Sequence, residues 1–181
     1  MFTHRSMAAA AAAALLAACA TTDSGTSRPA TGPGLGRVAT PQEIAAWDVS
    51  IPPSGAGLPA GRGTVKDGEA VYVAKCQACH GPKGAGKPAD PLVGGVGTLA
   101  SDKAVRTVGS FWPYATTLFD YTRRAMPTTR PMSLTDNEVY AVTAYLLYLN
   151  GIIGENDEMN AQTLPRVRMP NRDGFIDRSG R

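Results

Sequence analysis

Residues 76–80 read CQACH, so two cysteines with two residues between them are followed at once by a histidine. Three chemistries use such a Cys-x-x-Cys pair: a structural zinc site, a thioredoxin-like redox pair, and covalent attachment of a c-type haem. Zinc needs four ligands, and only Cys76, Cys79 and His80 lie close together here. A thioredoxin-like pair is expected within a strand–helix–strand pattern, which the sequence does not show. The motif therefore predicts a haem attachment site.

Haem attachment gives each residue of the motif its own role. The thiols of Cys76 and Cys79 add to the haem vinyl groups, and the imidazole of His80 binds the iron from the proximal side. The only other histidine, His4, falls in a predicted export signal. We therefore expect one covalently attached haem c with its iron, and no second histidine ligand.

Methionines are the candidates for the other axial position. Those that follow the motif are Met126, Met132, Met159 and Met169. We favour Met126, because it directly precedes Pro127 in a loop that could hold its thioether in place, and Met132 comes next. Met159 and Met169 are better explained as core residues. A His/Met pair predicts an electron carrier, whereas an open site predicts a peroxidase or a gas sensor.

The N-terminal region predicts export and a lipid anchor. Arg5 precedes an apolar run from Met7 to Ala18 that is too short to span a membrane. The sequence Leu16-Ala17-Ala18-Cys19 resembles a bacterial lipobox, in which Cys19 is acylated and residues 1–18 are removed. We therefore expect a periplasmic protein that is lipid-anchored to a bacterial membrane.

The predicted secondary structure is all-α. Thr64 can cap a helix that runs directly into CQACH, and Pro113 can open another helix that must end before Pro127. Thr135 and Glu138 form a capping box at the start of the last helix. No segment shows the sustained alternation that is typical of a strand.

These signals divide the chain into five parts. The predicted parts are a signal peptide (1–18), a flexible tether (19–40), a short helix and loop packing on the domain (41–60), a haem domain (61–152) and an extended tail (153–181). Trp47 is expected to pack against the haem domain. The formal charge of +3 and the charged fraction of 18% give no indication of a nucleic-acid partner.

Over residues 61–152 the pattern resembles the class I cytochrome c fold. The resemblance implies that the N- and C-terminal helices cross around one haem, with a small residue on one helix against an aromatic on the other. Gly68 with Tyr145 or Tyr148 fits that crossing. The resemblance also implies that a proline carbonyl accepts the N–H of His80. Pro91 in ADPLVGG is similar to that proline, and Pro88 is the alternative.

A narrower resemblance extends beyond the haem domain. The stretches TPQEIAAWD, VGSFWPYATTLFDYTRRAMP, SLTDNEVYAVTAYLLYLNGIIGE and LPRVRMPNRDGF are similar to the cytochrome subunit of bacterial sulfite or sulfane dehydrogenases, of the SoxD and SorB type. This implies that the chain accepts electrons from a molybdenum-cofactor subunit in periplasmic sulfur oxidation and passes them to the respiratory chain. Many SoxD-type chains carry two haems, and SorB-type chains are shorter. A membrane-tethered shuttle without a dedicated partner is the alternative.

For two further groups of residues, the sequence allows more than one role. Under the partner hypothesis, the tail docks on the catalytic subunit through Arg166, Arg168, Arg172 and Phe175, whereas composition alone favours a solvated tail. Trp112 and either Arg123 or Arg124 contact the haem propionates, or Trp112 only packs and the arginines are only solvated.

Overall fold

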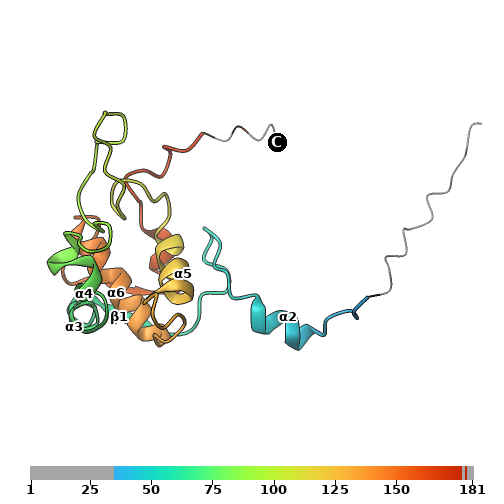
Figure 1. Ribbon diagram of the computed structural model, residues 1–181. Coiled ribbons are helices and arrows are strands. Elements are labelled where there is room, and N and C mark those ends of the chain that lie inside the picture. The colour runs from blue at the N-terminus through green and yellow to red at the C-terminus, as the bar shows by residue number, and fades with distance from the viewer. Residues whose placement is uncertain (1–34, 177, 179–181) are drawn as a thin grey trace, which may run out of the picture. The chain divides into compact units, whose positions relative to one another are not determined.

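The computed structural model describes residues 35–176 and 178 (Figure 1). The chain divides into two compact units, Met1–Glu43 and Ile44–Arg181. The predicted signal peptide, Cys19 and most of the tether lie outside the described residues. No helix within the described ranges is both long enough and apolar enough to cross a membrane.

Helix α2 (Pro41–Trp47) confirms the predicted short helix. The Thr40 N–H donates to Glu43 Oε2 at 2.8 Å, as in a capping box. The helix has no buried residue, and the side chain of Trp47 is 87% exposed, so the expectation that Trp47 packs on the domain is wrong. The physical reason is that the chain is first fixed to the domain after this helix: among the described residues, Ile51 is the first that is buried, and its N–H donates to Asp120 Oδ1 at 2.9 Å.

The centre of the domain is the close approach of α3 (Val65–Lys75) to α6 (Asp136–Leu149). A methyl group added to Gly68 would lie 1.9 Å from the Ala141 carbonyl oxygen and 2.8 Å from Tyr145 Cβ. The expected neighbour of Gly68 is therefore Tyr145 rather than Tyr148. A methyl group added to Gly63, in the preceding strand, would lie 2.1 Å from the Ala141 nitrogen.

The starts of α3 and α6 follow the caps that the sequence predicts, whereas the helix predicted to open at Pro113 begins two residues later. The Thr64 side chain accepts from the Asp67 N–H at 3.2 Å at the start of α3, and α6 begins with the Thr135/Glu138 capping box. Helix α5 (Ala115–Ala125) ends before Pro127 and lies beside α6 (Figure 1). The short helices α4 (Gln77–His80) and η1 (Pro82–Gly84) follow α3, and η2 (Leu164–Arg166) lies in the tail.

The described part of the chain is helical, as predicted, and a small sheet that the sequence did not predict is added to the helices. Strand β1 (Arg62–Thr64) pairs antiparallel with β2 (Glu158–Asn160), with Gly63 opposite Met159. Each strand has three residues, which is too short to show an alternating apolar pattern in the sequence.

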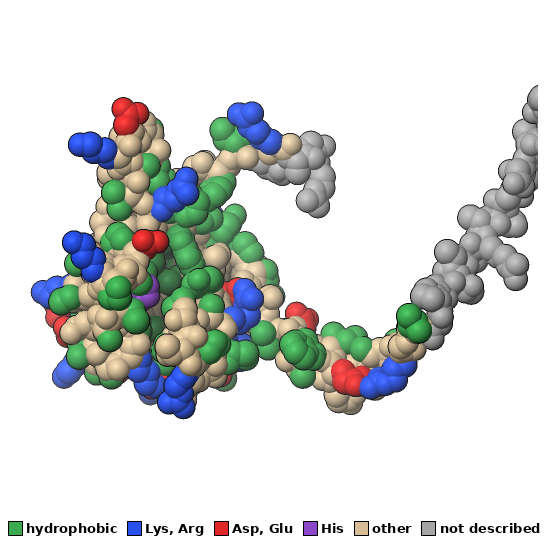
Figure 2. All heavy atoms as spheres, in the orientation of Figure 1, with side chains coloured by type: hydrophobic (Ala, Val, Ile, Leu, Met, Phe, Trp, Pro, Cys, Tyr) green, Lys and Arg blue, Asp and Glu red, His purple; other side chains and the backbone are tan. Residues whose placement is uncertain are grey.

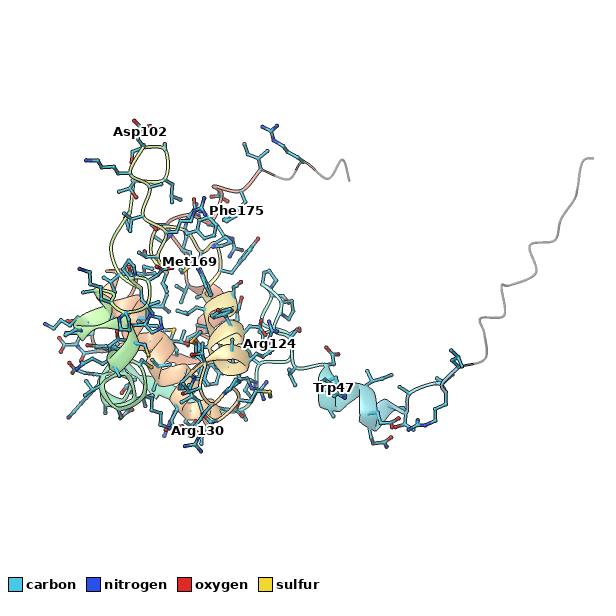
Figure 3. All side chains as sticks on the ribbon, in the orientation of Figure 1. Trp47, Asp102, Arg124, Arg130, Met169 and Phe175 are labelled. Atoms are coloured by element: carbon cyan, nitrogen blue, oxygen red, sulfur yellow. The ribbon has the colours of Figure 1, made fainter. Side chains whose placement is uncertain are left out.

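The tail is part of the core as far as Met169, and its description as an extended tail is wrong for these residues. Met159, Leu164 and Met169 are 4%, 0% and 1% exposed. Figure 3 shows Met169 on the helical domain, near α5. The expectation that Met159 and Met169 are core residues is confirmed. Their spacing fits neither a helix nor a strand, so no periodic signal was available.

The contact at Gly68 gives a first testable prediction. Helix propensity alone favours Gly68→Ala by about 1 kcal/mol. The overlap of the added methyl group with the Ala141 carbonyl makes the substitution destabilising instead. We expect a net loss of about 2–3 kcal/mol in the free energy of unfolding. Gly154→Ala is the control, because its methyl group would meet its nearest atom at 3.5 Å. Denaturant unfolding of both variants measures the difference, and equal stabilities would contradict the packing described.

Candidate haem-attachment site

The CQACH motif forms a tight turn at the end of α3. The Cys76 N–H donates to the Tyr72 carbonyl oxygen at 2.9 Å and so ends α3. The N–H groups of Cys79 and His80 both donate to the Cys76 carbonyl oxygen, at 3.1 and 3.0 Å. The backbone therefore sets the relative positions of the two thiols and the imidazole.

The imidazole of His80 is oriented by a backbone carbonyl. Its Nδ1 lies 3.1 Å from the carbonyl oxygen of Asp90. With the proton on Nδ1, the lone pair of Nε2 is free to bind a metal. The predicted acceptor was Pro91, and the observed one is one residue earlier.

The loop after the motif is held against it by three hydrogen bonds. The Gly86 N–H donates to the His80 carbonyl at 2.8 Å, and the Ala89 N–H donates to the Cys79 carbonyl at 2.9 Å. The hydroxyl of Tyr72, a fully buried residue, donates to the Gly81 carbonyl at 2.7 Å. Burial raises the pKa of Tyr72, so it remains a donor at neutral pH. These hydrogen bonds fold the loop back onto the motif, so that the carbonyl oxygen of Asp90 lies next to the imidazole of His80.

Asn150, at the end of α6, anchors the rest of this loop, and sequence reasoning missed that role. Its side-chain amide donates to the carbonyl of Leu92 at 3.1 Å, and its Oδ1 accepts from the Gly94 N–H at 3.2 Å. A methyl group added to Gly109 would lie 2.4 Å from the same Oδ1. The sequence showed Asn150 only as part of a helix stop, since a side chain that bridges to a distant loop leaves no periodic signal.

The two cysteines of the motif are free thiols in different environments. Cys76 is half-buried and Cys79 is exposed. Burial raises the pKa of the Cys76 thiol to about 11, so its sulfur is neutral at neutral pH. A thioether sulfur is also neutral, so this environment fits a sulfur bonded to a haem vinyl carbon. The donor set of two thiols and one oriented imidazole fits haem c.

The candidate distal ligands differ in exposure. Met126 is half-buried at the end of α5, where its N–H donates to the Thr122 carbonyl at 3.1 Å. Met132 is 57% exposed. Met159 and Met169 are buried in the core and face other side chains there. Among these four methionines, Met126 alone is half-buried, since Met132 is exposed and the other two are fully buried.

The residues considered for propionate contacts are engaged elsewhere in the protein. Trp112 packs edge-on against Tyr121, with ring centroids 5.5 Å apart. Arg123 pairs with Asp136 at 3.2 Å, and Arg124 pairs with Asp120 at 2.5 Å. Figure 2 shows histidine surface in purple next to hydrophobic surface in green, the environment expected around an apolar macrocycle. Within the described part of the chain, no group of three His, Cys, Asp or Glu residues could hold a metal ion.

Comparison with known proteins places these features in a family. Residues 63–146 match the family described as cytochrome c oxidase, cbb3-type, subunit III. The crystal structure of the sulfane dehydrogenase SoxCD from Paracoccus pantotrophus contains a chain that is 39% identical, with a TM-score of 0.76. The match covers 81% of this chain and 73% of that chain, so it extends well beyond residues 63–146. No curated protein sequence matches the chain significantly.

A pH-dependent prediction follows from an ion pair next to the motif. Lys75, which precedes Cys76, pairs with Glu138 of α6 at 2.5 Å. This hydrogen bond, together with that from the Thr135 N–H, lowers the pKa of Glu138 from 4.5. A carboxyl with a lowered folded-state pKa stabilises the protein above its unfolded-state pKa, and that contribution is lost as the pH falls through the folded value.

We therefore expect Glu138→Gln, which keeps an acceptor in the capping box, to cost about 1 kcal/mol at neutral pH. The cost should shrink as the pH falls below 4.5 and vanish once Glu138 is protonated in the folded state. Unfolding of both proteins across pH measures this. A difference in stability that does not change with pH would contradict the role given to the charge.

Proposed function

Because the chain belongs to the c-type cytochromes, in the family of the sulfane dehydrogenase cytochrome subunit, we propose that it is an electron carrier serving a molybdenum dehydrogenase. One haem c attached at Cys76 and Cys79 supplies a one-electron redox centre when bound. The single observation that carries the proposal is the preset turn: the imidazole of His80 is oriented by Asp90 beside two thiols.

The chain's own residues have defined tasks in this proposal. Cys76 and Cys79 fix the cofactor, and the Asp90 carbonyl holds the proton on His80 Nδ1, which leaves Nε2 for the iron. Met126 is the proposed second axial ligand, since it is the half-buried methionine at a helix end. A His/Met pair leaves no position for a substrate, so the chain transfers electrons and is not itself the catalyst.

The proposed electron donor is a molybdenum-cofactor subunit that oxidises sulfite or protein-bound sulfane sulfur. The support is the similarity to a chain of SoxCD, which extends beyond the cytochrome domain into the flanking segments. The electrons then pass to the respiratory chain. We place the protein on the periplasmic side of a bacterial membrane, anchored by a lipid on Cys19.

The tail is the proposed docking segment for this partner. Arg172 lies over the ring of Tyr114, 4.2 Å from its centroid, and Phe175 contacts Phe111 with ring centroids 5.2 Å apart. These contacts hold the tail in place on the domain. Arg166 and Arg168 are exposed, so they are available to an acidic partner surface.

Axial ligation is tested with Met126→Ala and Met132→Ala as a matched pair. We expect the ferric wild-type protein to show the sulfur-to-iron charge-transfer band of a bound thioether, and only Met126→Ala to lose it. Near-infrared absorption spectra of the three purified proteins measure this. A wild-type protein that lacks the band and binds carbon monoxide readily would contradict the electron-carrier proposal and favour an open-site enzyme or sensor.

Docking is tested with Arg166→Gln/Arg168→Gln, compared with Lys66→Gln/Lys103→Gln as a control of equal charge change. We expect the tail variant to slow electron uptake from a purified molybdenum subunit of a sulfane dehydrogenase about fivefold at low salt. The control should stay near the wild-type rate, and added salt should narrow the difference. Equal rates for the two variants in stopped-flow reduction would rule out docking through these arginines.

A further inference from the structure

The loop that contains Met126 is closed at its base by an ion pair. The loop runs from Met126, at the end of α5, to Thr135, the N-cap of α6. Arg123 lies in the last turn of α5 and Asp136 is the first residue of α6, and Arg123 Nε is 3.2 Å from Asp136 Oδ1. The pair therefore joins the two ends of the loop directly. Arg130, labelled in Figure 3, lies within this loop.

The side chains of this pair are partly buried. The side chains of Arg123 and Asp136 are 24% and 37% exposed, so solvent screens them only in part. The neighbouring Tyr140 is fully buried, and its ring contacts Phe119 with centroids 4.5 Å apart. Arg124, the next residue along α5, pairs with Asp120 in its own helix and does not join the loop ends.

We propose that Arg123 and Asp136 are positioning residues for the axial methionine: by holding the loop ends together, they keep the Met126 thioether from being displaced. This inference rests on the proposed function, because it takes Met126 as a ligand. A thioether is a weak ligand for iron, so how easily it is displaced depends on the free energy needed to open the loop that carries it. Loss of the pair makes the loop freer to open, and an external ligand then competes more easily.

The test is the binding of cyanide to the ferric holoprotein, followed by loss of the thioether charge-transfer band. We expect Arg123→Gln to bind cyanide about fivefold more tightly than the wild type. Arg124→Gln should differ from the wild type by less than about twofold, because its ion pair lies within one helix. Asp136→Asn should reproduce the effect of Arg123→Gln, and adding it to Arg123→Gln should cause little further change.

The outcomes separate this inference from the function on which it rests. A wild-type protein without the thioether band overturns both. A wild-type protein with the band, together with equal cyanide affinities in all variants, overturns the positioning role alone. Equal effects of Arg123→Gln and Arg124→Gln would also overturn it, because only Arg123 bridges the loop. In a double-mutant cycle, non-additive effects of Arg123→Gln and Asp136→Asn on cyanide affinity would support the positioning role. Additive effects on cyanide affinity would count against it. Either result holds whatever the two variants do to overall stability.

Discussion

The structure depends on one close approach, that of Gly63 and Gly68 to the backbone of Ala141. The two glycines lie in β1 and at the start of α3, and neither has room for a methyl group. Contact at this distance fixes α3 against α6. Because α3 runs directly into the cysteine motif, and α6 ends at Asn150, which holds the following loop, the same contact sets the frame for both sides of His80.

Within this frame the site is built mainly from backbone groups. The turn of CQACH is closed on the Cys76 carbonyl, and the imidazole is oriented by the Asp90 carbonyl. A backbone carbonyl held in a closed loop gives the fixed orientation that a metal-binding imidazole requires. Side chains such as Tyr72 and Asn150 support these backbone groups and do not themselves contact the motif's thiols or imidazole through hydrogen bonds.

The sequence predicted the features that local chemistry determines. The caps Thr64 and Thr135 mark helix starts because a side-chain oxygen bonds a nearby N–H, and this needs only neighbouring residues. Gly68 was found through the family resemblance. The features that were missed depend on distant partners: the three-residue strands, the burial of Leu164, and the exposure of Trp47. The acceptor for His80 was placed one residue too late, because which carbonyl faces the ring depends on the path of the loop.

In the proposed function, the chain is a single-haem electron acceptor for a partner that oxidises sulfur. The measurement that tests this most directly is rapid mixing of the ferric holoprotein with a substrate-reduced molybdenum subunit of a sulfane dehydrogenase, with haem reduction followed by absorbance. We predict reduction of one haem per chain at a rate that saturates with partner concentration. Absence of reduction, while a small-molecule reductant still reduces the haem, would contradict the account.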